Sequence, residues 1–298
     1  MESTSSPGLP SLCLGTVQIG QPYGIANPGR MPSVDCARAL LDAAWAGGIR
    51  RFDTARAYGD AEMRIGAWAA ARGVEPAIVT KFPPLEGADG PALIEAALDA
   101  SLAALGVARV EGLLAHRAAD LRLPGVAQHL RDLVSQGRVG AFGASAYSGV
   151  ELEEIVAIDG LGLVQLPFSV VDRRFATIVL WLAGAGIRVQ ARSVFLQGAL
   201  LMEPDALPLH LAGLGPVVRG LRALAHGAGT TPLALALGYA LGKRGLDSVV
   251  FGAYTRDQLA ACLAASATGP LDAETLGALD DLADGLPPEV VDPSRWPR

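Results

Sequence analysis

The sequence predicts an α/β fold, a (β/α)8 barrel with a C-terminal extension, in which residues 1–298 form a single domain. Three observations support this class. Eight short apolar runs alternate with segments whose apolar residues recur at helical spacing. The runs are apolar throughout, as expected for parallel strands that helices cover. The length of 298 residues is one that a single α/β barrel fills.

An open, doubly wound sheet would show the same alternation of strands and helices. The count of eight strands favours the closed barrel. In addition, no G-x-G-x-x-G motif follows the first strand, which weakens the case for a dinucleotide-binding open sheet.

Local signals along the chain place the elements. Residues 1–10 form a Ser-, Pro- and Gly-rich lead-in, and Ser33 caps the first long helix, which Gly47 and Gly48 end. The predicted strands are residues 11–16, 49–53, 77–81, 110–116, 139–145, 163–166, 187–192 and 248–252. The predicted helices are residues 34–46, 61–72, 91–105, 126–135, 150–158, 175–185, two or more within 216–242, 256–265 and 272–283. Loops are expected at 15–24, at 193–215, where a long loop can cover a pocket, and in an irregular tail at 287–298.

Composition excludes several classes of protein. Hydrophobic residues make up 51% of the chain and charged residues 18%, which is ample material for a buried core. A net charge of −6 argues against a nucleic-acid partner. No apolar segment reaches the roughly 20 residues of a membrane span and no signal peptide is visible, so we expect a cytoplasmic protein with no membrane partner. Its oligomeric state is left open.

Three cysteines are far apart and lack C-x-x-C spacing, which suits a reducing compartment. We expect Cys13, Cys36 and Cys262 to be small buried hydrophobic residues.

Polar residues follow three successive strands at the points where the strands end. Asp53 and Tyr58 follow one strand, Lys81 ends the next, and His116 ends the third. Barrels of this class carry their active sites at the carboxyl ends of the strands. The four side chains are therefore expected to meet in one pocket, although each alone could be an ordinary capping, surface or structural residue.

These four residue types suit the reduction of a carbonyl group. The oxygen of the substrate gains negative charge, so the site needs a proton donor, Tyr58, and a second hydrogen-bond donor, His116. A positive charge on Lys81 at about 4 Å is worth roughly 4 kcal/mol at an effective dielectric near 20, which would lower the pKa of Tyr58 by about three units. Asp53 would keep Lys81 charged and in place.

Other chemistries fit these residues less well. The four histidines include no H-x-H or H-x-x-x-H pair, which disfavours a metal-dependent hydrolase. A Schiff base on Lys81 is possible in principle, but the neighbouring Tyr58, His116 and Asp53 suit hydride chemistry better.

Several segments, in order along the chain, resemble the aldo-keto reductase family. They are GTVQIG at 15–20, DTARAYG at 53–59, TK at 80–81, LLAH at 113–116, GAS at 143–145, Gln165 and RSVFLQGALL at 192–201. The resemblance implies a nicotinamide cofactor bound in extended form, with Tyr58 as proton donor and Asp53, Lys81 and His116 completing a tetrad. YGIAN at 23–27 and ARSVFLQG at 191–198 are similar to a bacterial branch associated with sugar or polysaccharide metabolism.

The resemblance also implies cofactor-binding positions, which match less closely. Ser145 and Gln165 correspond to residues that hold the nicotinamide carboxamide, although Ala146 replaces an asparagine. Arg192, followed by Ser193, stands where an aromatic residue commonly stacks on the nicotinamide, and a planar guanidinium can also stack.

After the last strand, the segment from Gly252 to Gln258 corresponds to the part of the family that grips the adenosine 2′-phosphate. Its usual basic residues are absent, and Arg256 is the remaining candidate for this contact. The resemblance implies NADPH, with NADH, weak binding or no cofactor as alternatives.

The sequence therefore predicts an NAD(P)H-dependent reductase of a small-molecule aldehyde or ketone, with sugar-derived compounds as candidates. Two alternatives stay open. One is a redox-silent isomerase or lyase that uses Tyr58 and Lys81 for acid–base work, and the other is a noncatalytic regulatory subunit. Loop residues that the barrel places around its mouth are candidate substrate contacts: Tyr23, Phe82, Tyr147, Phe168 and Arg173.

Overall fold

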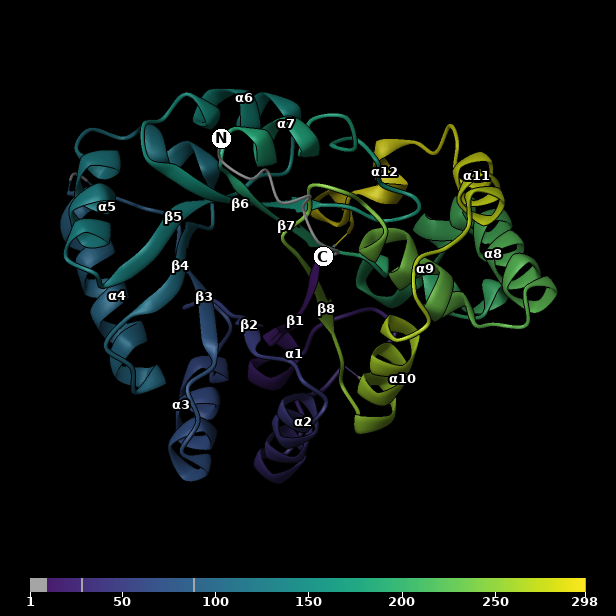
Figure 1. The fold of residues 1–298 in the computed structure, drawn as a ribbon, viewed down its shortest axis with the longest axis horizontal. Helices are drawn as coiled ribbons and strands as arrows, with labels where there is room; N and C mark the ends of the chain where they lie inside the picture. Colours follow the sequence, from purple (N-terminus) through teal and green to yellow (C-terminus); the bar gives the residue numbers. More distant parts are fainter. Residues whose placement is uncertain (1–9, 28, 88, 298) are drawn as a thin grey trace, which may run out of the picture.

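The computed structural model describes residues 10–27, 29–87 and 89–297, so the predicted lead-in lies almost entirely outside the described residues. Eight parallel strands form a closed barrel in chain order, which confirms the predicted fold class (Figure 1). β1 pairs with β8 from Ser11 opposite Ser248 to Gly15 opposite Gly252, and this pairing closes the barrel. The strands are β1 (Ser11–Gly15), β2 (Arg51–Asp53), β3 (Ala77–Phe82), β4 (Val110–Ala115), β5 (Val139–Ser145), β6 (Leu161–Pro167), β7 (Arg188–Arg192) and β8 (Ser248–Gly252).

Helices form an outer ring around the strands (Figure 1). They are α1 (Val17–Gly20), α2 (Val34–Ala46), α3 (Ala61–Arg72), α4 (Gly90–Leu105), α5 (Val126–Ser135), α6 (Gly149–Val156), α7 (Val179–Gly184), α8 (Gly215–Gly227), α9 (Pro232–Leu241), α10 (Arg256–Ser266), α11 (Ala273–Leu282) and α12 (Pro288–Val291). The helix cap predicted at Ser33 is present. The Ser33 hydroxyl accepts a hydrogen bond from the Cys36 amide at the start of α2.

Three segments differ from the predictions. The helix predicted from residue 175 begins at Val179, because residues 173–178 form turns with hydrogen bonds to the third residue before. The loop predicted at 15–24 contains the short helix α1. The tail predicted to be irregular contains α12 and a 3₁₀ turn at Pro293–Arg295. Each of these elements has fewer than two helical turns, with at most 6 residues, which is too short for a recurring apolar pattern to be recognised in the sequence.

The two-residue period of the strands separates an apolar layer from a polar one inside the barrel. Val79, Leu114 and Leu163 form a small apolar cluster of their own. Because β4 and β6 are not neighbours, contact between their residues crosses the lumen. Two residues further along, on the same side of the chain, come Lys81 on β3, Gln165 on β6, and His116 directly after the end of β4. The polar layer therefore rests on an apolar floor.

Charged side chains close the amino-terminal end of the barrel. Both oxygens of Glu111 accept hydrogen bonds from Arg51, at 2.9 and 2.8 Å, and Arg188 donates to Glu111 at 2.6 Å. Arg51 also pairs with Asp247 at 2.7 Å. The network joins β2, β4, β7 and the segment before β8 at the end opposite the predicted site.

The C-terminal extension packs against the side of the barrel that carries α8 and α9 (Figure 1). Val290, Val291 and Trp296 are buried, and the Trp296 ring lies edge-on to His210 at a centroid distance of 5.7 Å. Cys13 and Cys262 are buried as predicted, whereas Cys36 is exposed on α2, so that prediction is wrong. None of the helices in the described part of the chain is long and apolar enough to span a bilayer.

Replacement of Glu111 by Gln should destabilise the barrel, because Arg51 and Arg188 would lose their shared carboxylate while still largely buried. We expect the free energy of unfolding in urea to fall by about 2 kcal/mol. Glu154→Gln is the matched control, since its ion pair with Arg122 is exposed, and it should cost less than about 0.5 kcal/mol. Equal losses in the two variants would contradict a structural role for the network.

Candidate active site

One cavity of about 570 Å³ opens at the carboxyl end of the barrel. This volume is within the usual range for small-molecule sites, about 300–1,000 Å³. All of the predicted site residues except Arg256 line it: Asp53, Tyr58, Lys81, His116, Ser145, Gln165, Arg192, Ser193, Gly252 and Gln258. Ten predicted residues from separate segments of the chain thus share one cavity, including Gly252 at the end of β8 and Gln258 in the first turn of α10.

A buried ion pair lies at the base of the cavity. The Lys81 Nζ atom is 2.6 Å from Asp53 Oδ1 and donates a second hydrogen bond to the Thr54 carbonyl at 2.9 Å. Only 1% of the Lys81 side chain and 6% of the Asp53 side chain are exposed. Burial is the largest single effect on the pKa of Lys81 and lowers it, but the charge of Asp53, the nearby Tyr58 and the hydrogen bond to Asp53 together outweigh burial, and the pKa is raised. Lys81 is therefore an ammonium at neutral pH.

Asp53 also accepts a hydrogen bond from Gln165 Nε2 at 2.7 Å. The same nitrogen donates to Gln190 Oε1 at 3.2 Å. The side-chain nitrogen of Gln165 therefore binds the ion pair, while its oxygen forms no hydrogen bond among the described residues. The sequence pattern did not indicate Gln190; the available signal was its place on an inward-facing position two residues before Arg192.

Tyr58 lies on the loop between β2 and α3, where close backbone contact holds it. A Cβ atom added to Gly20 would come within 1.9 Å of the Tyr58 carbonyl oxygen, so only glycine fits at the end of the GTVQIG segment. Gly59 follows in the left-handed region, at φ 53°. The Lys81 Nζ atom lies 5.2 Å from the centroid of the Tyr58 ring.

The pKa of Tyr58 is raised, not lowered as the sequence analysis expected. Burial of the phenol is the largest cause, and it outweighs the opposing effect of Lys81; Asp53 raises the pKa further. The expectation was wrong because it counted the charge of Lys81 without the cost of placing a phenolate in the cavity. Tyr58 accordingly keeps its proton at neutral pH.

The His116 ring faces Tyr58 edge-on, with a centroid distance of 6.0 Å and an interplanar angle of 84°. Burial, followed by the positive charge of Lys81, lowers the pKa of His116 to about 4. His116 is therefore a neutral imidazole at neutral pH. Its Nδ1 atom is buried and has no hydrogen-bond partner within the described residues.

Arg192 lies at the end of β7 among neutral partners. Its Nε atom donates to Ser145 Oγ at 3.2 Å, Nη1 donates to Ser193 Oγ at 3.3 Å, and Nη2 donates to the Ala146 carbonyl at 3.4 Å. The guanidinium carbon lies 4.0 Å from the centroid of the Tyr147 ring. Ser193 itself has φ 61°, a conformation that turns the chain sharply away from the strand.

The end of β8 and the start of α10 form the other arm of the cavity. Gly252 packs against the Gln18 side chain so closely that an added Cβ atom would lie 2.0 Å from Gln18 Nε2. Gln258 caps α10 by accepting a hydrogen bond from the Tyr254 amide at 2.7 Å. Arg256 is exposed at the first turn of α10 and lines two shallow depressions beside α2 rather than this cavity.

Of the candidate substrate contacts, Tyr23 and Tyr147 line the cavity. Phe82, Phe168 and Arg173 are not among its lining residues, and Arg173 pairs with Asp280 at 2.8 Å instead. Gln18, which the sequence analysis did not select, lines the cavity, and its Oε1 atom is buried without a partner among the described residues.

The lowered pKa of His116 links stability to pH. In the unfolded chain His116 takes up a proton near its ordinary pKa of 6.5, whereas the folded protein resists protonation until about pH 4. Stability from this group is therefore complete above pH 6.5 and is lost as the pH falls toward 4. We expect the loss to reach about 3 kcal/mol, because one pKa unit is worth about 1.4 kcal/mol.

Urea unfolding of the wild type and of His116→Asn at several values in this pH window measures the effect. The wild type should lose more stability on acidification than the variant, since the carboxylates that also titrate are common to both. Parallel curves would contradict the neutral, buried imidazole.

Comparisons with known proteins agree with this architecture. The sequence matches the aldo/keto reductase family over residues 11–284. An aldo-keto reductase from Bacillus halodurans in its holo form has a similar structure, with a TM-score of 0.78 at 22% identity, covering 98% of this chain and 97% of that one. A glycerol dehydrogenase from Gluconobacter oxydans has a TM-score of 0.74 at 20% identity, with coverages of 96% and 99%.

No curated protein matches the sequence. Because the structural relatives are below 25% identical, they support the fold, and the family match carries the assignment. The chain belongs to the aldo/keto reductase family, whose members are oxidoreductases that act on small-molecule carbonyl compounds.

Proposed function

We propose that this chain reduces an aldehyde or ketone, with sugar-derived carbonyl compounds as the candidate class, and that Tyr58 donates the proton. The observation that carries the proposal is the arrangement of Asp53, Tyr58, Lys81 and His116 around one cavity, with the Lys81 ammonium buried against Asp53 and 5.2 Å from the Tyr58 ring. The same four residues, in the same order, carry the resemblance to the family.

The charges of the site suit a neutral acid that becomes an anion during the reaction. Tyr58 holds its proton before the reaction because burial raises its pKa. When the proton passes to the substrate oxygen, the phenolate that remains is stabilised by the nearby ammonium of Lys81. Tyr58 is partly exposed to the cavity, so solvent can return the proton between turnovers.

His116 supplies the second contact to the substrate oxygen. Because its imidazole is neutral, one ring nitrogen carries a hydrogen and the other does not. Nδ1 is buried, which leaves Nε2 as the atom able to point into the cavity and donate to the oxygen. A neutral donor positions the carbonyl group without competing with Tyr58 for the proton transfer.

The cavity fits a nicotinamide dinucleotide in extended form. It continues from the four residues, past Ser145, Gln165 and Arg192, to Gly252 and the start of α10. The free oxygen of Gln165 and the hydroxyl of Ser145 can bind a carboxamide, and the amino-terminal end of the 11-residue helix α10 suits an anion. When bound, the cofactor, NADPH in this proposal, supplies the hydride that the carbonyl carbon accepts.

The charged state of Lys81 supports reduction over chemistry that needs a free amine. A Schiff base requires an unprotonated lysine. The pKa of Lys81 is raised and its ammonium is bound to Asp53 and to the Thr54 carbonyl, so attack on a carbonyl carbon is disfavoured.

Tyr58→Phe should lower kcat by about 10²–10⁴-fold, because the variant lacks the proton donor. The oxidation of the reduced nicotinamide, followed by absorbance and matched to the alcohol formed, gives the rate. Tyr23→Phe is the matched control: it removes a phenol from the same cavity and should cost less than about tenfold. Similar losses in the two variants would refute the assignment of Tyr58, and turnover without nucleotide oxidation would refute the reductase.

Arg256 lies outside the cavity but in the same first turn of α10 as Gln258, which lines it. Arg256 is therefore proposed as the contact for an adenosine 2′-phosphate that extends beyond the cavity. Fluorescence titration of the wild type should show saturable binding of NADPH and weaker binding of NADH. Arg256→Ala should weaken NADPH binding about tenfold and change NADH binding by less than about twofold, since one charged contact to phosphate is lost. Arg122→Ala, which removes an exposed arginine on a 3₁₀ turn distant in sequence from α10, is the control.

If Arg256→Ala binds NADPH as tightly as the wild type does, the 2′-phosphate lies elsewhere. If the wild type binds neither nucleotide, the reductase proposal fails.

A further inference from the structure

The cavity holds one positive charge for which the described residues provide no acidic partner. Asp53 and Lys81 neutralise each other, and His116 is neutral because its pKa is lowered to about 4. Glu203, at the rim, pairs with Arg222 at 2.8 Å. Arg192 forms no ion pair in the part of the chain that the structure describes.

The partners of Arg192 leave part of its hydrogen-bonding capacity unused. A guanidinium has five N–H groups. Three of them point to the neutral oxygens of Ser145, Ser193 and Ala146, at distances of 3.2 to 3.4 Å that are long for charge-assisted bonds. The two remaining N–H groups, one on Nη1 and one on Nη2, have no hydrogen-bond partner among the described residues, and neighbouring nitrogens of a guanidinium can bind a carboxylate in two parallel bonds.

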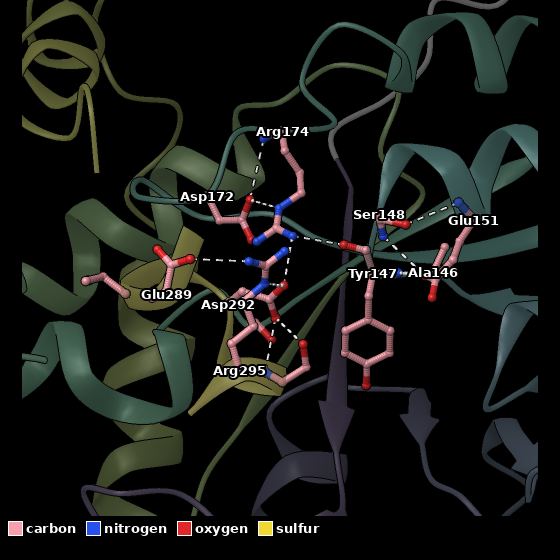
Figure 2. Close-up of polar contacts among 12 residues, drawn as sticks. Ala146, Tyr147, Ser148, Glu151, Asp172, Arg174, Glu289, Asp292 and Arg295 are labelled. Carbon is pink, nitrogen blue, oxygen red and sulfur yellow. Dashed lines mark hydrogen bonds and ion pairs between the residues drawn. The ribbon is translucent and has the colours of Figure 1, made fainter. Parts of the chain in front are cut away.

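The acidic side chains nearest to this region are held by another arginine. Arg174 donates to Asp172 at 2.8 Å and to Asp292 at 3.1 Å, and Asp292 also contacts Arg295 at 3.7 Å (Figure 2). Asp172 lies within electrostatic range of Arg192 but forms its ion pair with Arg174. The C-terminal segment that contains Asp292 thus contributes to an ion-pair cluster separate from the cavity.

Tyr147 contacts both this cluster and Arg192. Its backbone carbonyl accepts a hydrogen bond from Arg174 at 2.9 Å, whereas its ring points away from that carbonyl and from Arg174 (Figure 2). That ring lies against the guanidinium of Arg192 at 4.0 Å. The guanidinium is therefore fixed by a neutral aromatic face and neutral oxygens, with its charge left to act on the contents of the cavity.

Arg192 lines the same cavity as Tyr58 and His116, the residues proposed to hold the carbonyl group. Its charge also acts on both of them, lowering the pKa of each as a minor effect beside burial and Lys81. A group bound to Arg192 would therefore lie near the carbonyl group of the same substrate molecule. Stacking uses the face of a guanidinium and carboxylate binding uses its edge, so contact with a nicotinamide does not compete with this role.

We propose that Arg192 binds the carboxylate of the substrate, and that the natural substrate is a carbonyl compound that carries a carboxylate group. The identification of the carbonyl group rests on the proposed function, whereas carboxylate binding by Arg192 does not. The negative charge of the substrate would complete the charge balance of the cavity, and this requirement would select acids over neutral carbonyl compounds of the same size.

Matched probes test the proposal. The dissociation constants of para-carboxybenzaldehyde and of its uncharged methyl ester are measured by calorimetry at neutral pH, with and without saturating nucleotide, and the meta isomers are measured in the same way. We expect the wild type to bind the acid of at least one isomer about tenfold more tightly than the ester. In Arg192→Gln this ratio should fall to about one, and Arg192→Lys should restore part of it.

Arg122→Gln, which removes a charge of the same sign from a residue that does not line the cavity, should keep the wild-type ratio. Thermal unfolding of each variant reports whether it is folded. Because the ratio compares the dissociation constants of the acid and the ester on the same variant, a loss of affinity that affects both ligands equally leaves it unchanged. The proposal is overturned if neither isomer shows a preference for the acid, or if the preference survives in Arg192→Gln.

Turnover of the same probes with NADPH and NADH separates this proposal from the proposed function. Reduction of acid and ester at equal kcat/KM would retain the reductase and reject the carboxylate contact. An Arg192-dependent preference in binding, without turnover of any probe, would retain the carboxylate contact and reject the reductase.

Discussion

The ion pair between Lys81 and Asp53 is the constraint on which the site depends. An ammonium and a carboxylate can be buried inside a barrel only when each neutralises the other and the remaining hydrogen-bonding groups are satisfied. Gln165 and the Thr54 carbonyl meet that requirement, at 2.7 and 2.9 Å. Because each member of the pair is held by a further hydrogen bond, the charge of Lys81 acts on Tyr58 from a fixed position.

The barrel places the Lys81–Asp53 pair at the base of the cavity, where the charge of Lys81 can act on Tyr58. Apolar residues fill the lumen one step below, so water is excluded from beneath the pair, and the polar residues face the open carboxyl end. Burial raises the pKa of Tyr58 and lowers that of His116, which leaves two neutral groups beside a fixed cation. In the proposed reaction, the cation acts when negative charge appears on Tyr58.

The strands and the four central site residues could be predicted from the sequence, because the strands carry strong local signals. Each predicted strand is present, and its ends lie within two residues of their predicted positions. Polar residues at successive strand ends predicted that Asp53, Tyr58, Lys81 and His116 would share a cavity, since parallel strands in a barrel end on one face.

The remaining features depend on distances between segments that are remote in sequence. The contact of Gln190 with Gln165 and the contact of Tyr147 with Arg192 leave no local pattern in the sequence. The direction of the Tyr58 pKa shift was predicted wrongly because burial, its largest cause, depends on the whole cavity. The order in the tail around Asp292 follows from its contact with Arg174, which lies 118 residues earlier.

The proton affinity of Tyr58 in the presence and absence of the ion pair tests the central claim most directly. The pKa of Tyr58 is measured by NMR titration of tyrosines labelled with carbon-13 at Cζ. The Tyr58 signal is the one that is missing from the spectrum of Tyr58→Phe. The account predicts a pKa above the ordinary value of about 10 in the wild type, and a higher one in the double variant Asp53→Asn, Lys81→Met. A pKa at or below the ordinary value, or one that the double variant leaves unchanged or lowers, would contradict the account.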